Sequence, residues 1–224
     1  MKNLQKKTET NIMKHYMPKK SVKSILYSLF ILIILVSCAG FQLTQPLLEE
    51  VERPERPAIP EMIMGQGIIP ATDMAVFLLN ANPELCPDFA RDLSAYYVEE
   101  AAIEGINHDV AFAQMVLETG HLRFGGLVTS DMNNFAGLGS TGPGNPGLSF
   151  PEPRIGVRAQ VQHLKAYASD EPLNQLLVNP RYFLVNLGSS PSIRGLAGTW
   201  AADPQYAEKI FAVLERLYVF SFGY

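Results

Sequence analysis

Residues 107–120 read NHDVAFAQMVLETG, and this stretch decides how the rest of the chain is interpreted. Asn107 is a residue type that caps the N-termini of helices, and Gly120 is typical of the position just beyond a C-terminus. Between them, apolar residues recur at helical spacing. The stretch therefore predicts a helix that Asn107 caps and that runs through Thr119. It places the carboxyl group of Glu118 at the C-terminal end of that helix.

Helical patterns also occur on both sides of this segment, and no internal repeat is found. The segments expected to be helical are Thr72 or Asp73 to Leu79, residues 87–104, Val157 to Tyr167, short pieces near 172–178 and 192–198, and a last helix from Pro204. By contrast, residues 120–156 contain nine glycines and four prolines, a density that disfavours regular helix. We expect an α+β fold that is mainly α, with a helical body and a small β or loop lobe.

The N-terminal residues have the pattern of an export signal. Seven lysines precede residue 24, and an apolar run follows over residues 25–36. A basic segment, a short apolar segment and small residues at a cleavage site are typical of secretory signals. The sequence Leu-Val-Ser-Cys at 35–38 resembles the lipobox of bacterial lipoproteins, which implies that Cys38 is lipid-modified. We expect residues 1–37 to be the signal, with Met13 or Met17 as alternative starting points.

Residues 38–70 are rich in proline and glutamate, which stiffen and extend a linker, so we expect a tether there and a domain over 71–224. Without residues 1–37 the chain has 11 Lys and Arg against 21 Asp and Glu, a net charge of −10. Such a charge disfavours nucleic acid as a partner. Cys86 is then the single cysteine beyond the lipobox, so an internal disulfide is excluded. We expect a monomer.

Glu118 is the strongest candidate for chemistry. It lies in a mainly apolar segment, and desolvation by such neighbours raises the pKa of a carboxyl group. A carboxylic acid that is still protonated near neutral pH can donate its proton to a glycosidic oxygen. The alternative is a solvent-facing glutamate at a helix end, although the helix dipole disfavours a negative charge there. The residues alone leave both possibilities open.

Three later segments follow in order: NNFAGL at 133–138, Phe150-Pro151 with GVRAQV at 156–161, and TWAADPQYA at 199–207. Together with residues 107–120 they resemble bacterial N-acetylglucosaminidases of peptidoglycan, a family that includes flagellar muramidase-like glucosaminidases and many autolysins. The resemblance covers roughly residues 85–218. It implies a lysozyme-like fold with a substrate groove between a helical body and a variable lobe. It also implies hydrolysis of the β-1,4 bond after N-acetylglucosamine in peptidoglycan.

By position in these motifs, the resemblance implies that Glu118 is the general acid. Tyr206 is expected to line the site, where its hydroxyl would bond the sugar or a reaction intermediate. Asn134 and Phe135 are expected to build the groove floor. The alternative for Tyr206 is a core position on the last helix.

Most glycosidases use a second carboxylate, and the resemblance implies that it lies in the variable lobe. Residues 125–155 offer only Asp131 and Glu152 for this role. Asp131 has the alternative of capping a turn. If neither reaches the sugar, we expect the 2-acetamido oxygen of the substrate to attack, with Tyr206 assisting.

Sugars also bind to flat aromatic surfaces. The candidates are Trp200, Tyr167, Phe124 and Phe135, of which Trp200 ranks first because it is the only tryptophan and lies in a matched motif. Core packing is the alternative for each.

Three other functions remain open. A peptidase would use Cys86 with His108, His121 or His163 as its base. A lytic transglycosylase would use the same acid but release an anhydro sugar, and a cell-wall-binding lipoprotein would lack catalysis. The scattered histidines predict no metal site, and no cofactor is expected. The expected location is the cell envelope, through a lipid anchor at the outer membrane or the periplasmic face.

Overall fold

The structure is a computed structural model that describes residues 56–223. The expected signal, Cys38 and the first part of the expected tether lie outside the described residues. Within residues 56–223, none of the helices combines the length and the apolar character that crossing a membrane requires.

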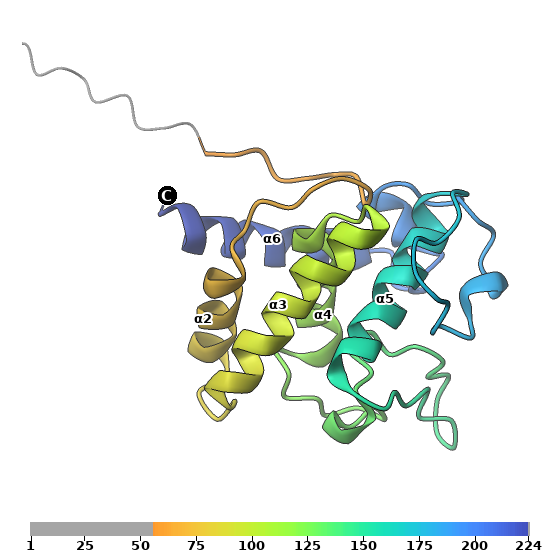
Figure 1. Ribbon diagram of the computed structural model, residues 1–224, viewed down its shortest axis with the longest axis horizontal. Coiled ribbons are helices and arrows are strands. Elements are labelled where there is room, and N and C mark those ends of the chain that lie inside the picture. The colour runs from red at the N-terminus through yellow and green to blue at the C-terminus, as the bar shows by residue number, and fades with distance from the viewer. Residues whose placement is uncertain (1–55, 224) are drawn as a thin grey trace, which may run out of the picture. The chain divides into compact units, whose positions relative to one another are not determined.

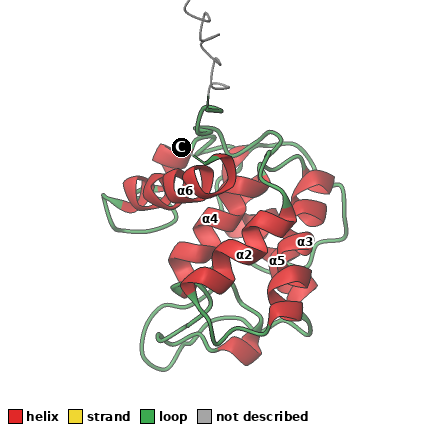
Figure 2. Ribbon diagram, turned by 90° about the vertical axis from the view of Figure 1, so that its left-hand side faces the viewer, coloured by secondary structure: helices red, strands yellow, loops and turns green. Residues whose placement is uncertain are grey.

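The described part of the chain folds into five α-helices joined by loops and short 3₁₀ helices (Figure 1). The α-helices are α2 (Ala71–Ala81), α3 (Pro87–Glu104), α4 (His108–Thr119), α5 (Pro153–Ala168) and α6 (Tyr206–Phe222). The 3₁₀ helices are Ser130–Met132, Tyr182–Leu184 and Ile193–Leu196. Figure 2 shows no regular strand in these residues. The expected mainly α architecture is therefore confirmed.

Helix α4 lies at the centre of the body. Its residues 108–116 are all buried, and it contacts α3, α5 and α6. The Asn107 side chain accepts hydrogen bonds from the amides of Asp109 and Val110, which is the N-cap that the sequence predicts. Gly120 takes the left-handed conformation, with φ of 59°, and ends the helix. A helix with residues 108–116 buried on every side fixes Glu118, in its last turn, relative to the rest of the domain.

The lobe is the segment between α4 and α5, residues 120–152. Its only ladder pairing in the described residues is an isolated bridge between Gly142 and Asn145. Glycine is required where the lobe meets α5, because a Cβ on Gly156 would lie 1.8 Å from the carbonyl oxygen of Asn133. The lobe is thus a loop structure that packs closely on the start of α5.

Residues 56–70 differ from the expected tether, because they pack on the helical body and belong to the same compact unit, which begins at Arg56. Ile63 and Ile69 are fully buried in the core. The carboxylate of Asp109 accepts hydrogen bonds from the amides of Ile68 (3.0 Å) and Ile69 (3.1 Å). Proline content predicted the extended backbone but not its burial, which depends on a partner 40 residues away.

The helical piece expected near 172–178 is wrong, whereas the one near 192–198 corresponds to the 3₁₀ helix Ile193–Leu196. Tertiary contacts explain the difference. The amides of Asn174 and Gln175 donate to the carboxylate of Glu104, and the amide of Val178 donates to the side chain of Gln162. These amides are therefore satisfied by side chains of α3 and α5 rather than by a helix of their own.

Candidate active site

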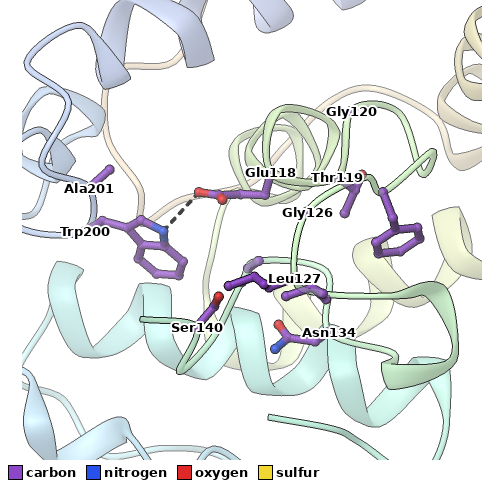
Figure 3. A pocket seen from close by; sticks show the side chains of 13 residues that line it. Glu118, Thr119, Gly120, Gly126, Leu127, Asn134, Ser140, Trp200 and Ala201 are labelled. Carbon is purple, nitrogen blue, oxygen red and sulfur yellow. Dashed lines mark hydrogen bonds between the residues drawn. The ribbon is translucent and has the colours of Figure 1, made fainter. Parts of the chain in front are cut away.

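A groove of about 420 Å³ lies where the C-terminal end of α4 meets the lobe and the segment before α6 (Figure 3). Its lining residues are Glu118, Thr119, Gly120, Phe124, Gly126, Leu127, Val128, Asn134, Ala136, Gly137, Ser140, Trp200 and Ala201. This volume is in the range of small-molecule and sugar-sized sites. Of the described residues that line it, only Glu118 carries a carboxyl group.

Glu118 reaches the groove because the chain reverses immediately after it. Gly120, His121 and Leu122 all have positive φ near 60°, so they form a left-handed turn. The turn is held by the Thr119 hydroxyl, which donates to the carbonyl of Met115 (2.8 Å) and accepts from the amide of Leu122 (2.9 Å). Non-glycine residues adopt this conformation at a cost, so the tight reversal is a strained feature beside the acid.

Two donors meet one oxygen of the Glu118 carboxyl group. The Trp200 indole Nε1 donates to Glu118 Oε1 over 3.2 Å, as Figure 3 shows. The hydroxyl of Tyr206, at the start of α6, donates to the same oxygen. No described residue donates to Oε2. A Cβ built on Gly137 would lie 3.7 Å from Oε2, which is van der Waals contact, so this oxygen lies beside the lobe at Gly137.

The environment of Glu118 acts on its pKa in two opposite directions. The side chain is open to solvent at the groove, but the protein surrounds it elsewhere, and this desolvation is the largest influence and raises the pKa. The hydrogen bonds from Tyr206 and Trp200 favour the charged form and act in the lowering sense. The net result is a raised pKa, which is the property that a general acid requires.

Behind the site, a chain of buried polar groups crosses the helical body. Gln114 Nε2 donates to the Tyr206 hydroxyl (3.1 Å), and Gln160 Nε2 donates to Gln114 Oε1 (2.9 Å) and to the carbonyl of Ala111 (3.0 Å). The Tyr97 hydroxyl donates to Gln160 Oε1 (2.6 Å). All three side chains beyond Tyr206 are fully buried. The chain links α3, α5 and α4 to the tyrosine of α6 that contacts Glu118.

Tyr206 occupies a different place from the one expected. It is 5% exposed and does not line the groove, because its hydroxyl lies between Gln114 and Glu118. Burial and the nearby Glu118 carboxylate raise the pKa of Tyr206, so it stays a neutral hydroxyl. The structure therefore brings Tyr206 to the acid rather than to a position facing the sugar.

Asn134 lines the groove, whereas Phe135 lies beneath it. The side chain of Asn134 donates to the carbonyls of Leu138 and Leu148 (2.9 Å each) and accepts from the amide of Leu138 (2.9 Å). These three bonds fix the base of the lobe wall, and Asn134 also lines the groove. Phe135 is 1% exposed and belongs to the core beneath the wall. It supports the floor without reaching the groove.

The aromatic residues near the groove form one cluster and one separate ring. Trp200 packs against His163 and Tyr167, with ring centroids 5.0 Å and 5.6 Å away. Tyr167 donates to the carbonyl of Thr199 (3.1 Å), which holds the segment that carries Trp200. Burial lowers the pKa of His163 to about 4, so its ring is neutral beside Trp200. Phe124 lines the groove from the strained turn.

The structure does not bring Asp131 or Glu152 into the groove lining. Asp131 is exposed, and it accepts a hydrogen bond from the Thr129 hydroxyl (2.6 Å) in a short 3₁₀ helix, which is a local turn interaction. Glu152 is exposed at the N-cap of α5. Asp131 therefore follows the commoner use of Asp in loops, whereas the Glu152 side chain makes no capping hydrogen bond.

Cys86 lies apart from the groove. It is exposed at the N-cap of α3 and lines a separate surface hollow with Asn82 and Arg123. The structure gives no hydrogen bond between this thiol and any described histidine. The residues needed for a cysteine peptidase are therefore not assembled in the described part of the chain.

Sequence reasoning missed Gln114, Gln160 and Gly137. The two glutamines lie in helices whose neighbouring residues are almost all buried, and a polar amide in such a position needs a buried partner. That signal was visible in the sequence, but the identity of the partner was not. Gly137 is part of the recognised NNFAGL segment, and its place opposite Glu118 depends on the lobe's path.

The comparisons with known proteins agree with this geometry. The sequence model of the glucosaminidase family, described as mannosyl-glycoprotein endo-beta-N-acetylglucosaminidase, matches residues 94–219. A protein of Borreliella burgdorferi, described as uncharacterized, is 39% identical over 155 residues, which cover 69% of this chain and 76% of that protein. No solved structure matches. The family match includes Glu118, Trp200 and Tyr206, and covers more than half of the chain. The chain therefore belongs to the glucosaminidase family of glycan-hydrolysing enzymes.

Proposed function

We propose that the protein is an exported, lipid-anchored hydrolase that cleaves the β-1,4 bond after N-acetylglucosamine in peptidoglycan, with Glu118 as its general acid. The observation that carries the proposal is the placement of one carboxyl group in a sugar-sized groove, with both donors on Oε1 and a raised pKa. A binding protein has no need for a partly desolvated acid at such a place. The family match supports a glycan as the substrate.

In this mechanism Glu118 gives its proton to the glycosidic oxygen, and the bond from that oxygen to the anomeric carbon breaks. No second carboxyl group lines the described groove, so the 2-acetamido oxygen of the N-acetylglucosamine unit attacks the anomeric carbon as the leaving chain departs. The resulting cyclic oxazolinium is opened by water, which returns a proton to Glu118. The net change is the addition of one water molecule.

Tyr206 does not assist the acetamido group in this scheme, because its hydroxyl is bound to Glu118 and Gln114. Trp200 has two roles: its Nε1 donates to Oε1 of the acid, and its side chain lines the groove, where its ring offers a surface for a sugar face. The acidic domain must bind its substrate through such local contacts.

The location rests on the N-terminal pattern. The lysine-rich segment, the apolar run and the Leu-Val-Ser-Cys ending support export and lipid attachment at Cys38. Metabolic labelling with a lipid precursor, compared between the natural chain and Cys38→Ala, tests this part. Labelling that is equal in both chains would remove the anchor from the proposal.

The enzymatic part is tested by digesting purified peptidoglycan with the full chain and with Glu118→Gln. We expect the variant to lose activity by at least about 10²-fold, the contribution of a general acid. Mass spectrometry of the natural protein's products should show reducing N-acetylglucosamine ends. Anhydro ends would identify a transglycosylase, and equal activity of both proteins would refute the role of Glu118.

A further inference from the structure

The buried chain of polar groups behind Glu118 has a direction that can be derived from one backbone atom. The carbonyl oxygen of Ala111 can only accept a hydrogen bond, so the atom of Gln160 that meets it must be the amide nitrogen. The second hydrogen of that nitrogen goes to Gln114, whose oxygen must therefore face Gln160. The nitrogen of Gln114 is then the atom that faces Tyr206.

This direction determines what the Tyr206 hydroxyl can do. Its oxygen accepts from Gln114, so its hydrogen is directed to the remaining partner, Oε1 of Glu118. The hydrogen has no other acceptor among the described residues, because the oxygen of Gln114 is turned to Gln160. Tyr206 is therefore held as a donor toward the acid. Trp200 Nε1, which can only donate, meets the same oxygen.

An acid proton on Oε1 would face the hydrogens of both donors. Oε2 receives no hydrogen bond from a described residue; it lies beside Gly137, and both residues line the groove. Resting on the proposed function, we infer that Gln114, oriented by Gln160 and the Ala111 carbonyl, is a positioning residue that keeps the transferable proton of Glu118 on Oε2, the oxygen available to the glycosidic bond.

Few titratable groups surround the pair. Tyr206 faces Glu118 from α6, and Tyr167 of α5 lies near enough to act on Tyr206. His163, also from α5, lies behind Trp200 and is neutral. The groove lining adds no further titratable side chain among the described residues. Whether the Tyr206 hydroxyl donates to Glu118 or accepts from it therefore mainly determines which oxygen of Glu118 carries the proton.

The test replaces Gln114 with methionine, which keeps the length of the side chain and removes its donor. The Tyr206 oxygen is then free to accept a proton from Oε1, and its hydroxyl becomes a weaker donor because Gln114 no longer polarises it. Both changes favour the neutral form of Glu118 with its proton on Oε1 instead of Oε2. We expect kcat on peptidoglycan to fall about tenfold at unchanged KM, and the titration of Glu118 to move to higher pH.

Two measurements keep this test separate from the proposed function. Carboxyl carbon NMR of the full chain labelled in glutamate follows the titration without any substrate, and Glu118→Gln identifies the signal. If the natural protein lacked activity while Gln114→Met moved the titration upward, the function would fail and the proton placement would stand. If the natural protein were active and the titration of Gln114→Met were unchanged, the inference would be overturned.

Matched variants separate positioning from general loss of packing. Gln162 is as buried as Gln160, on the same helix, but bonds the 176–179 loop. Gln162→Met should leave the titration unchanged, and an equal upward shift in this variant would overturn the inference. Tyr97→Phe should also leave it unchanged, because the Ala111 carbonyl sets the direction. If Gln114→Met does not fold, Gln160→Met releases the same orientation and must raise the titration.

Discussion

The two ends of helix α4 carry two carboxylates that the structure treats in opposite ways. Asp109 lies in the first turn and Glu118 in the last, and each accepts a hydrogen bond from a tyrosine of α6, Tyr218 for Asp109 and Tyr206 for Glu118. Asp109 is fully buried, and both of its oxygens are occupied by donors. Glu118 is open to the groove, and only one of its oxygens is occupied.

The helix dipole strengthens this difference. It favours the negative charge of Asp109 at the N-terminus and disfavours that of Glu118 at the C-terminus. A saturated carboxylate at a favourable end stabilises the fold, whereas an unsaturated one at an unfavourable end is available for proton transfer. The same pair of residue types therefore separates stability from chemistry along one helix.

Replacing Asp109, at the N-terminal end of α4, should have the largest effect on the free energy of unfolding. Asp109→Asn places amide hydrogens against the donors of Ile68, Ile69 or Tyr218 and should reduce the free energy of unfolding by about 3 kcal/mol. Urea unfolding measures this. Asp131→Asn, at an exposed carboxylate, is the control and should change stability by less than about 0.5 kcal/mol. Equal losses in the two variants would contradict the contrast.

Replacing Tyr206 or Tyr218 with phenylalanine should have the next largest effect, and the two variants form a matched pair. Tyr206→Phe should lower kcat by about tenfold or more, because it removes the group that directs the acid. Tyr218→Phe should leave kcat of the folded protein unchanged and cost about 1–2 kcal/mol of stability. Steady-state kinetics and urea unfolding of both variants decide. A fall in kcat for fully folded Tyr218→Phe would show that the two ends of α4 do not separate stability from catalysis.

The pH dependence sharpens the comparison. Because desolvation raises the pKa of Glu118, the high-pH limb of kcat/KM should lie above the range of an ordinary glutamate. Trp200→Phe removes a donor that favours the charged form, so the limb should move to still higher pH. Rate profiles across pH 4–9 measure both. A limb that moves to lower pH would contradict the assigned role of the indole.

The smallest expected effect is the change in stability when Glu118, at the C-terminal end of α4, is replaced. A carboxyl group whose pKa is raised by folding binds its proton more tightly in the folded state, so its ionisation above that pKa costs stability. Glu118→Gln should therefore raise the melting temperature at pH 7, by at most about 2 °C because solvent screens the exposed group. Calorimetry at pH 7 and at pH 3, where the gain should vanish, tests the sign.

Local signals in the sequence predicted much of the helical body. Asn107 and Gly120 marked both ends of α4, the range predicted for α3, residues 87–104, is the one observed, and the glycine and proline density marked the lobe. The path of residues 56–70 could not be read in the same way. Its burial depends on Asp109, and only the folded chain brings that carboxylate to the amides of Ile68 and Ile69.

The site was predicted in part. Glu118 and Trp200 were placed by their motifs, and both line the groove. Tyr206 was expected to face the sugar, but its side chain is buried and its hydroxyl is bonded to Glu118 and Gln114. The relay through Gln114 and Gln160 links residues 46 positions apart on two helices, and no local pattern encodes that register.

The three hydrogen bonds of Asn134 also make the lobe a place for engineering. They fix the carbonyls of Leu138 and Leu148, the two ends of a loop whose tip is the exposed turn at 142–145. Lengthening a loop whose ends are fixed adds little to the entropic cost of closing it. A reporter peptide or a sugar-binding module inserted at this tip would project beside bound glycan while the groove keeps its shape.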